Sequence, residues 1–365
     1  KAKLYSKQKL YTNFVGGTIL SLLVLLILFL TPLSNYILSF SLNLFNNPVK
    51  GIIYWISSII YVLIIFTLID LVELPIDFYS GYILEKKFDL GNLTKIQWLK
   101  DQVKSYIISM IFIIPIILGI FYIGRTYPNQ WWIYAGIIYI VLIGILTNIS
   151  HLIFFPLFYN LEEVDDENLE EELIQLSEDN GVSKVEKVVK VLAGEKTEKA
   201  NAGFAGMGRT KRLYLFDTLL EKFHEDEIKG VVAHEVGHYV HKDVFRFIII
   251  EIITIFPMLF VVNLIFSNLG SFTNFNNLPL LLLIIFGLQS LLEPLENLYS
   301  RHRERKADLF AAKAIKESEG LISGFKRLSD INLSEIEPSW IVEILFYDHP
   351  PLNKRIEMVK NYEEN

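Results

Sequence analysis

The sequence contains no cysteine among its 365 residues. This absence excludes disulfide bonds, a cysteine nucleophile, iron–sulfur clusters and every thiolate metal site. Any metal ion must therefore be bound by His, Asp or Glu side chains. Charge is also scarce, since Asp, Glu, Lys and Arg make up 21 % of the chain and the net charge is −7. Because no long basic patch occurs, nucleic acid is not expected as a partner.

Apolar residues are abundant instead, at 52 % of the chain. One soluble core cannot hide so much apolar surface, so we expect an all-α polytopic membrane protein. Six apolar stretches are candidates for helices that cross the bilayer, which takes ~20 residues. They are residues 14–34, 51–69, 105–124, 131–158, 247–267 and 278–292, the last continuing as a helix to residue 299.

The basic residues predict how these spans are oriented. Residues 1–12 carry four lysines and the loop 73–104 carries five, whereas the loops 35–50 and 125–130 carry one basic residue each. Basic loops remain in the cytoplasm. We therefore expect both termini and the polar segment 159–245 on the cytoplasmic side.

The polar segment begins with an acidic run. Residues 162–179 hold ten acids and no base, which favours the solvated face of an amphipathic helix, with a cation-binding run as the alternative. Runs rich in β-branched and aromatic residues at 188–192 and 212–216 predict two strands. We expect a small α+β unit beside the membrane helices.

A histidine motif lies at the end of this segment, where residues 231–243 read VVAHEVGHYVHKD. In a helix, His234 and His238 are one turn apart on one face, so both imidazoles can reach a single zinc ion. Glu235 lies beside that face and can take a proton from a water that the metal activates. The valines around the motif predict a buried helix, in which two histidines without a ligand would be costly.

The residues leave two candidates for a third ligand. His241 is seven residues after His234, but a straight helix puts them about 10 Å apart along its axis, so we interpret His241 as an exposed or supporting residue. Further on, Glu304 and Asp308 share one face of a second predicted helix. Glu304 could complete a His₂Glu site and Asp308 could hold a ligating histidine. Spacing alone does not distinguish this from an ordinary charged helix start.

The order of these motifs resembles that of the zinc CaaX prenyl proteases, integral-membrane relatives of the gluzincin metallopeptidases. HEVGH is followed by two apolar segments, by SRHRERKAD at 300–308, and by HPP at 349–351 with Arg355. Other similarities span almost the whole chain: KAK at 1–3, DLVELP at 70–75, EKKF at 85–88, WW at 131–132, NA at 201–202 and KRLYLFDTL at 211–219.

The resemblance implies roles for individual residues. His234, His238 and Glu304 are expected to bind one zinc ion. Glu235 is expected to be the general base, and Asp308 the partner of a ligating histidine. An intact set of this kind argues against an inactive relative.

The resemblance also implies where substrate binds. His349 and Arg355 are expected near the site, where they bind substrate or stabilise the oxyanion; a structural turn and a surface salt bridge are the alternatives. The substrate is expected to lie extended along an edge strand by main-chain pairing. The residues of that strand are Asn201, Ala202, Gly203 and Phe204.

The family fold is a ring of transmembrane helices around a water-filled chamber, with the zincin site facing inward at its cytoplasmic end. Polar residues in the spans, such as His151 and Glu251, are expected to face this chamber or a partner. The family has seven spans, so we expect the first to be absent or removed here. The predicted division is four spans in 1–158, a zincin segment in 159–245, two spans in 246–299, and a helix with the HPP element in 300–365.

These features predict a zinc-dependent membrane endopeptidase that cuts prenylated CaaX peptides after the cysteine. Peptide or prenylated-peptide substrate and membrane lipids are the expected partners, and no obligate protein partner is evident. A quality-control protease of the HtpX type is the alternative within the same chemistry. A membrane channel or scaffold is the alternative of another class, which the intact ligand set disfavours.

Overall fold

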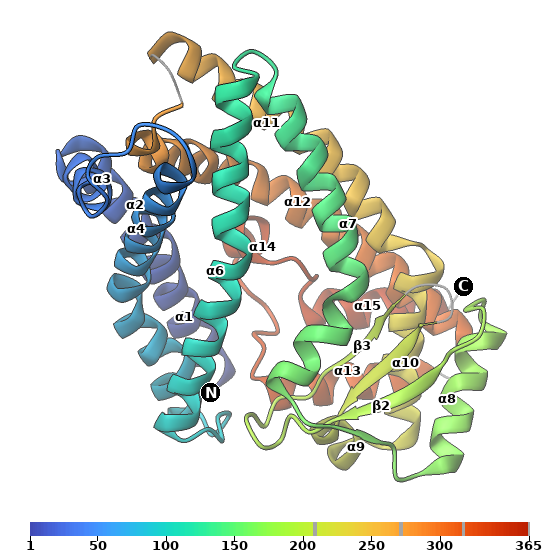
Figure 1. The fold of residues 1–365 in the computed structure, drawn as a ribbon. Coiled ribbons are helices and arrows are strands. Elements are labelled where there is room, and N and C mark those ends of the chain that lie inside the picture. The colour runs from blue at the N-terminus through green and yellow to red at the C-terminus, as the bar shows by residue number, and fades with distance from the viewer. Residues whose placement is uncertain (207–209, 270–272, 316–317, 364–365) are drawn as a thin grey trace.

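The computed structural model describes residues 1–206, 210–269, 273–315 and 318–363. Long helices extend from one end of the molecule, and a small sheet with shorter helices lies at the other end (Figure 1). The functional residues of the sequence motifs belong to the end with the sheet.

Six helical segments are long and apolar enough to cross a bilayer, so the predicted number of spans is confirmed for the part of the chain described. Many of their apolar side chains point outward; Ile107, Ile111 and Val141 are each more than half exposed. Outward apolar faces of this extent are what lipid requires and what water disfavours. The spans are Ala2–Leu30, Ile52–Lys87, Lys95–Thr126, Trp131–Phe158, Asp243–Leu269 and Phe275–Ala314.

Several spans consist of consecutive helical elements. The first span joins α1 (Ala2–Asn13), η1 (Phe14–Leu20) and α2 (Ser21–Leu30), and the second joins α4 (Ile52–Phe78), η2 (Tyr79–Ile83) and α5 (Leu84–Lys87). Between them lies α3 (Leu33–Asn43). The other spans are α6 (Lys95–Thr126), α7 (Trp131–Phe158), α11 (Asp243–Leu269), and η3 (Phe275–Asn277) with α12 (Leu278–Ala314).

Aromatic packing joins the spans at the end far from the sheet. Phe275 is fully buried and its ring stacks on Phe121 of α6 with the centroids 4.3 Å apart. Two pairs of polar side chains join α7 to α11, whereas the buried His151 of α7 has no hydrogen-bond partner among the described residues. Trp131 donates its indole N–H to Asn263 at 2.8 Å. The hydroxyl of Tyr139 donates to Glu251 at 2.9 Å, which removes the cost of burying an unpaired polar group.

Within the described residues, the sheet has four strands in the order β1-β2-β4-β3. β2 (Lys187–Val191) is parallel to β4 (Arg212–Phe216), while β1 (Leu161–Glu163) and β3 (Ala202–Ala205) pair antiparallel at the two sides. Both strands expected from the sequence are therefore present. The end of α7 covers one face, where Phe155 stacks on Tyr214 with the centroids 4.7 Å apart.

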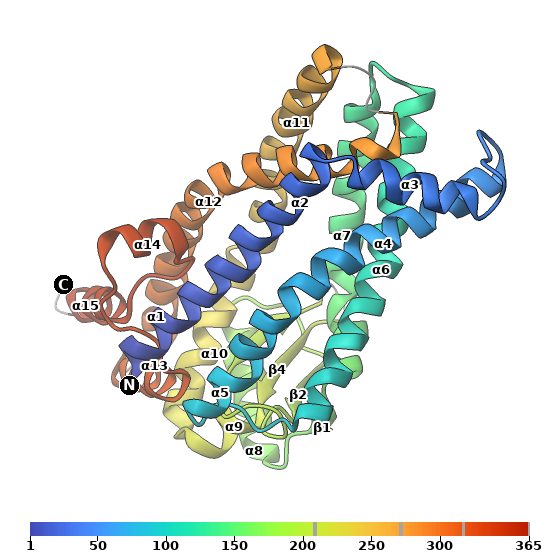
Figure 2. The ribbon, with the colours of Figure 1, turned by 90° about the vertical axis from the view of Figure 1, so that its left-hand side faces the viewer.

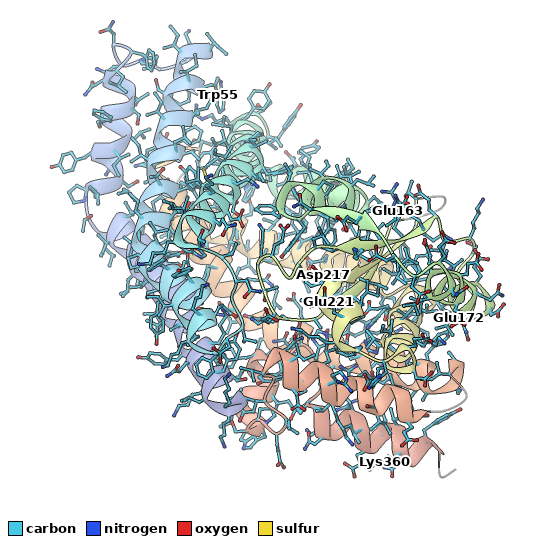
Figure 3. The ribbon with its side chains drawn as sticks, turned by 90° about the horizontal axis from the view of Figure 1, so that it is seen from below. Trp55, Glu163, Glu172, Asp217, Glu221 and Lys360 are labelled. Carbon is cyan, nitrogen blue, oxygen red and sulfur yellow. The ribbon has the colours of Figure 1, made fainter. Side chains whose placement is uncertain are left out.

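The acidic run forms α8 (Glu167–Asp179) on the other face of the sheet. Leu169 and Leu173 are buried against the core, and Asp166 caps the helix by accepting from the backbone N–H groups of Asn168 and Leu169 at 3.1 Å. The acids lie on the outer side, as an amphipathic solvated helix requires. Seen from below, Glu172 of α8 and Lys360 of the last helix lie on different sides of this end, and Trp55 lies away from both (Figure 3).

The central helix α10 (Glu225–Val240) follows the short α9 (Asp217–Lys222) and packs closely on its neighbours. A Cβ atom at Gly230 would lie 2.8 Å from the Cα of Leu321, and one at Gly237 would lie 3.1 Å from the Cα of Ala307. Glycine therefore permits both close crossings. Leu321 belongs to α13 (Ser318–Asn332) and Ala307 to α12; α14 (Trp340–Phe346) and α15 (Leu352–Glu363) complete the chain.

The spans continue without interruption into the unit with the sheet. α11 already begins at Asp243, and α12 runs from the apolar region through residue 300 to Ala314. The divisions predicted at residues 245 and 299 therefore fall inside single helices, because the rise in charge along these segments does not end a helix.

Candidate active site

The helix α10 holds the histidine motif in a buried setting. It begins with a capping box, in which Glu227 accepts from the backbone N–H of His224 at 2.9 Å. Val231, Val232 and Val236 face the core below the sheet. This packing fixes the rotation of α10, so its two histidines are presented together on the side toward α12.

Three side chains converge on that side. The Nε2 atoms of His234 and His238 lie 3.1 Å apart. A carboxylate of α12 lies against both, because Glu304 Oε1 is 3.0 Å from His238 Nε2 and Glu304 Oε2 is 3.4 Å from His234 Nε2. Among the described residues, these three form the one group of His, Asp and Glu side chains whose possible ligand atoms all lie within 4.8 Å of one another. The structure thus brings together the three residues expected to bind zinc.

The other candidate ligand lies outside this group. His241 follows the last residue of α10, and its ring packs edge-on against Phe310 with the centroids 5.6 Å apart. The helix has already ended there, so His241 does not continue the metal-facing side.

Each imidazole is held from behind by a carboxylate. Asp308 Oδ1 lies 2.8 Å from His234 Nδ1, and Asp243 Oδ2 lies 2.8 Å from His238 Nδ1. A carboxylate on Nδ1 places the proton there and leaves Nε2 free to bind a metal. Asp308 is in the place that the resemblance implied, whereas Asp243 was not foreseen.

An arginine compensates the charge of each of these carboxylates. Arg355 binds Asp308 through both Nε and Nη2, at 2.9 and 2.6 Å. Arg303 donates its Nε–H to Asp243 at 2.6 Å, and both side chains are 3 % exposed. The Arg303–Asp243 pair joins two helices that are 60 residues apart in the sequence, so no local motif predicts it. The sequence shows only that a charged residue lies close to each segment that carries a ligand.

The donor set fits a divalent metal ion. Two imidazole nitrogens and one carboxylate are ligands that zinc takes in catalytic sites. Glu304 Oε2 is buried and has no hydrogen-bond donor among the residues described. Burial lowers the pKa of His238, but hydrogen bonds to Asp243 and Glu304 outweigh it and raise this pKa to about 10. The surroundings therefore strongly favour positive charge at this point.

Glu235 lies next to His234 on the same helix. Burial raises the pKa of its carboxyl group above the ordinary value, although the positive charge of the neighbouring imidazoles acts in the opposite direction. A carboxylate with a raised pKa is a better proton acceptor than an ordinary one.

His349 lies at the open side of the three ligands. It is on the loop between α14 and α15, its side chain is 56 % exposed, and its Nε2 is 3.5 Å from Glu304 Oε1. Its Nδ1 is bound to Asp348 at 2.8 Å. Burial lowers the pKa of His349, but the bond to Asp348 and the charge of Glu304 raise it overall.

Arg355 is placed differently from His349. Its guanidinium lies over the ring of Phe325 at 3.9 Å and 3.3 Å from His234 Nδ1, behind the imidazole rather than on its open side. Its ion pair in this position is with Asp308, the carboxylate that also binds His234 Nδ1.

The expected substrate strand is β3, at the edge of the sheet. Ala202, Gly203 and Phe204 pair with β4, and the carbonyl of Asn201 accepts from the N–H of Phe216 at 3.0 Å. This register directs the backbone groups of Ala202 and Phe204 away from β4. The ring of Phe204 contacts Tyr239, next to His238, with the centroids 5.5 Å apart. The free edge of β3 therefore lies beside the metal-binding helix.

Comparison with known families identifies the chain. The family model described as "Peptidase family M48" matches residues 163–363, which include all three expected ligands. The chain belongs to peptidase family M48. A second description, "CAAX prenyl protease N-terminal, five membrane helices", matches residues 1–160 of this M48 peptidase, where the structure has four candidate spans.

Relatives of this M48 peptidase occur in bacteria and eukaryotes. The uncharacterized metalloprotease YhfN of Bacillus subtilis is 27 % identical over 85 % of this chain and 75 % of its own length. CAAX prenyl protease 1 of Saccharomyces cerevisiae is 26 % identical over 82 % and 71 %. The crystal structure of S. mikatae Ste24p has the same fold, with a TM-score of 0.78 and 24 % identity over 90 % of this chain and 80 % of that one.

The M48 assignment and the spans together make this protein an integral-membrane metallopeptidase. Its ligand group lies on α10 and on α12, of which the second is also a membrane span. The site is therefore built at the junction of the two ends of the molecule.

Proposed function

We propose that this M48 peptidase is a zinc endopeptidase that cleaves prenylated CaaX-type peptides after the cysteine. The observation that carries the proposal is the convergence of His234, His238 and Glu304 with Glu235 beside them. The names of the relatives from yeast and Arabidopsis thaliana, CAAX prenyl protease 1 and its homolog, support the substrate class.

The chemistry needs a base, a positioned peptide and a stabilised carbonyl oxygen. Zinc would be held by the three ligands and would act as a Lewis acid. Glu235 takes a proton from the attacking water as the oxygen of that water bonds to the carbonyl carbon. The same carboxyl group gives that proton to the leaving nitrogen as the C–N bond breaks.

The surrounding residues position these groups. Asp308 and Asp243 hold the two imidazoles, and Arg355 and Arg303 keep these carboxylates ionised. We infer that Arg355 acts through Asp308, since it lies behind His234. His349, on the open side, can donate a hydrogen bond to the carbonyl oxygen as charge develops there.

The substrate would lie along β3 as an added strand. The backbone groups of Ala202 and Phe204 are directed to the free edge, where an extended peptide can pair with them. The side chain of Asn201 accepts a hydrogen bond from the N–H of Ala202 at 2.9 Å. A substrate peptide must displace this hydrogen bond to pair with the N–H of Ala202.

Mass spectrometry of cleaved peptides tests the function. Purified protein with zinc is incubated with matched farnesylated and unmodified CaaX peptides, and Glu235→Gln is the control. We expect cleavage after the cysteine of the farnesylated peptide alone, and none by the variant. Equal cleavage of both peptides would favour a quality-control peptidase, and cleavage by Glu235→Gln would remove Glu235 from its role.

We also propose that the active site faces the cytoplasm, on the basis of the lysine-rich segments 1–12 and 73–104. The cysteine-free chain allows single Glu171→Cys and Asn47→Cys variants, both at exposed positions. An impermeant maleimide should label Glu171→Cys only in inside-out vesicles and Asn47→Cys only in right-side-out vesicles. The reverse pattern would place the site on the other side.

A further inference from the structure

A short helix outside the six spans carries an apolar outer face. In α14, Trp340 is 70 % exposed, and Ile341 and Ile344 are 49 % and 44 % exposed. Glu343, on the inner side of the same helix, is only 8 % exposed. A seven-residue helix with so much exposed apolar surface needs a partner that is not part of the described chain.

The inner side of α14 is fastened to its neighbours. Arg301 of α12 donates Nη1–H to the carbonyl oxygens of Glu343, at 2.8 Å, and of Tyr347. Asn297 donates to the carbonyl oxygen of Leu345 at 3.0 Å. Lys354 binds the carboxylate of Glu343 at 2.7 Å. These contacts fix the rotation of the helix, so its apolar face stays outward.

The position of α14 along the spans coincides with a change from charged to apolar sequence. The ring of Phe346 packs edge-on against Phe14 of the first span with the centroids 5.9 Å apart. Phe14 is the first residue of the apolar stretch 14–34, five residues after Lys9, the last charged residue before it. Asp348, two residues after α14, shares a cavity of about 230 Å³ with Phe247, which begins the apolar part of α11. The helix therefore lies at the level where two spans enter the hydrocarbon.

The turns of α12 that bind α14 also carry exposed apolar side chains. Leu291, Leu295 and Leu298 lie on one face of α12 and are 73 %, 64 % and 60 % exposed. Asn297, in the same turns, is bonded to α14. α14 lies beside the lower part of α12, on the outer side of the molecule (Figure 2).

We propose that α14 is an interfacial helix whose apolar face is buried in the phospholipid bilayer. Tryptophan is enriched at the boundary between water and lipid, and amphipathic helices lie in that plane. Tyr347, Asp348 and His349 follow α14 directly, and His349 reaches within 3.5 Å of Glu304. Contact with lipid thus holds the loop that carries His349 to the active site.

Spin-label accessibility in lipid nanodiscs tests the proposal, because the chain has no cysteine to be removed. Ile341→Cys, Ile344→Cys and Leu345→Cys carry the label, with Ile107→Cys as the lipid reference and Glu171→Cys as the aqueous reference. We expect the ratio of oxygen to Ni-EDDA collision at the α14 sites to match that of Ile107→Cys and to exceed that of Glu171→Cys.

Two results would overturn the proposal. Collision ratios equal to those of Glu171→Cys would place α14 in water. Dipolar broadening between labels on separate molecules would show that a second copy, rather than lipid, covers the face. Helical circular dichroism and bound zinc verify the fold of each labelled protein, and the three sites test the same face independently if one variant does not fold.

Discussion

At the scale of single residues, each imidazole of the site is supported by an aspartate and an arginine behind it, and we call each such set of three side chains a relay. His234 is backed by Asp308 and Arg355, and His238 is backed by Asp243 and Arg303. The first relay was partly predictable, because Asp308 is one helical turn from Glu304. The second was not, because its members lie on the three helices α10, α11 and α12, and only the tertiary fold brings Arg303 to the other two.

The third ligand gives the first prediction. Glu304→Ala removes one of three ligands and should abolish near-stoichiometric zinc binding, whereas His241→Ala should retain the metal because its ring lies against Phe310. Zinc is measured by plasma mass spectrometry on the purified proteins. Loss of zinc in His241→Ala alone would support a site on a single helix.

The unforeseen relay gives the second prediction. Asp243→Asn weakens the hold on His238 and leaves Arg303 without its anionic partner, so zinc affinity should fall about 10–100-fold. Competition with a chelator measures the affinity. Asp165→Asn is the matched control, since Asp165 also pairs with a cation but its side chain is 86 % exposed; an equal loss in both variants would contradict the prediction.

Glu227 gives a prediction of pH dependence. Burial raises the pKa of its carboxyl group, but bonds from Ser323, the backbone of His224 and Arg327 outweigh this and lower it below 4.5. The carboxylate therefore stabilises the fold above pH 4.5, and this contribution is lost as pH falls through the lowered pKa. Glu227→Gln should cost about 1–3 kcal/mol at pH 7.

Unfolding in detergent between pH 7 and pH 3 checks this prediction. The difference between Glu227→Gln and the parent should shrink as the pH falls. Glu225→Gln, at a position whose side chain is 66 % exposed on the same helix, should differ little from the parent at any pH. A difference that is constant with pH would exclude the carboxylate as its source.

At the scale of elements, the crossing of α10 and α12 decides whether the ligands meet. The spans and strands were predictable because composition and periodicity report burial directly. The crossing was not, because it depends on Gly237 facing Ala307, and a glycine in a helix carries no signal of what lies opposite.

The close approach gives an element-scale prediction. Gly237→Val should push α10 away from α12, lower stability by about 1–3 kcal/mol and weaken zinc binding. Thermal unfolding and zinc content are measured together. Gly287→Val on α12 is the control, since a Cβ there meets no atom within 4 Å; similar losses in both would trace the effect to valine in a helix.

At the scale of the whole molecule, the metal group lies between separate hydrophobic cores. One core joins the spans around Phe275, and another joins the sheet to α8 and α10. Neither core includes a ligand, so we expect the fold to be independent of the metal. The membrane character and the motif order were predictable from sequence, but the outward face of α14 was not, since 340–346 is too short for a span.

Chelation tests this independence. Removing zinc should abolish cleavage and lower the unfolding midpoint, while the helical circular dichroism stays unchanged. Zinc at about 1,000 times its dissociation constant should restore activity and return about 4 kcal/mol of stability. Loss of helix on chelation would show that the metal is structural as well as catalytic.

The unbroken course of α12 has a mechanical consequence. The helix has 37 residues, and at about 1.5 Å per residue Glu304 lies about 40 Å along it from Leu278. A tilt of about 1° about the far end then moves the carboxylate by about 0.7 Å, whereas catalytic geometry tolerates about 0.5 Å. Spans tilt to match the thickness of the bilayer. A change in the acyl length of the surrounding lipid should therefore shift the Glu304 carboxylate and change the turnover rate.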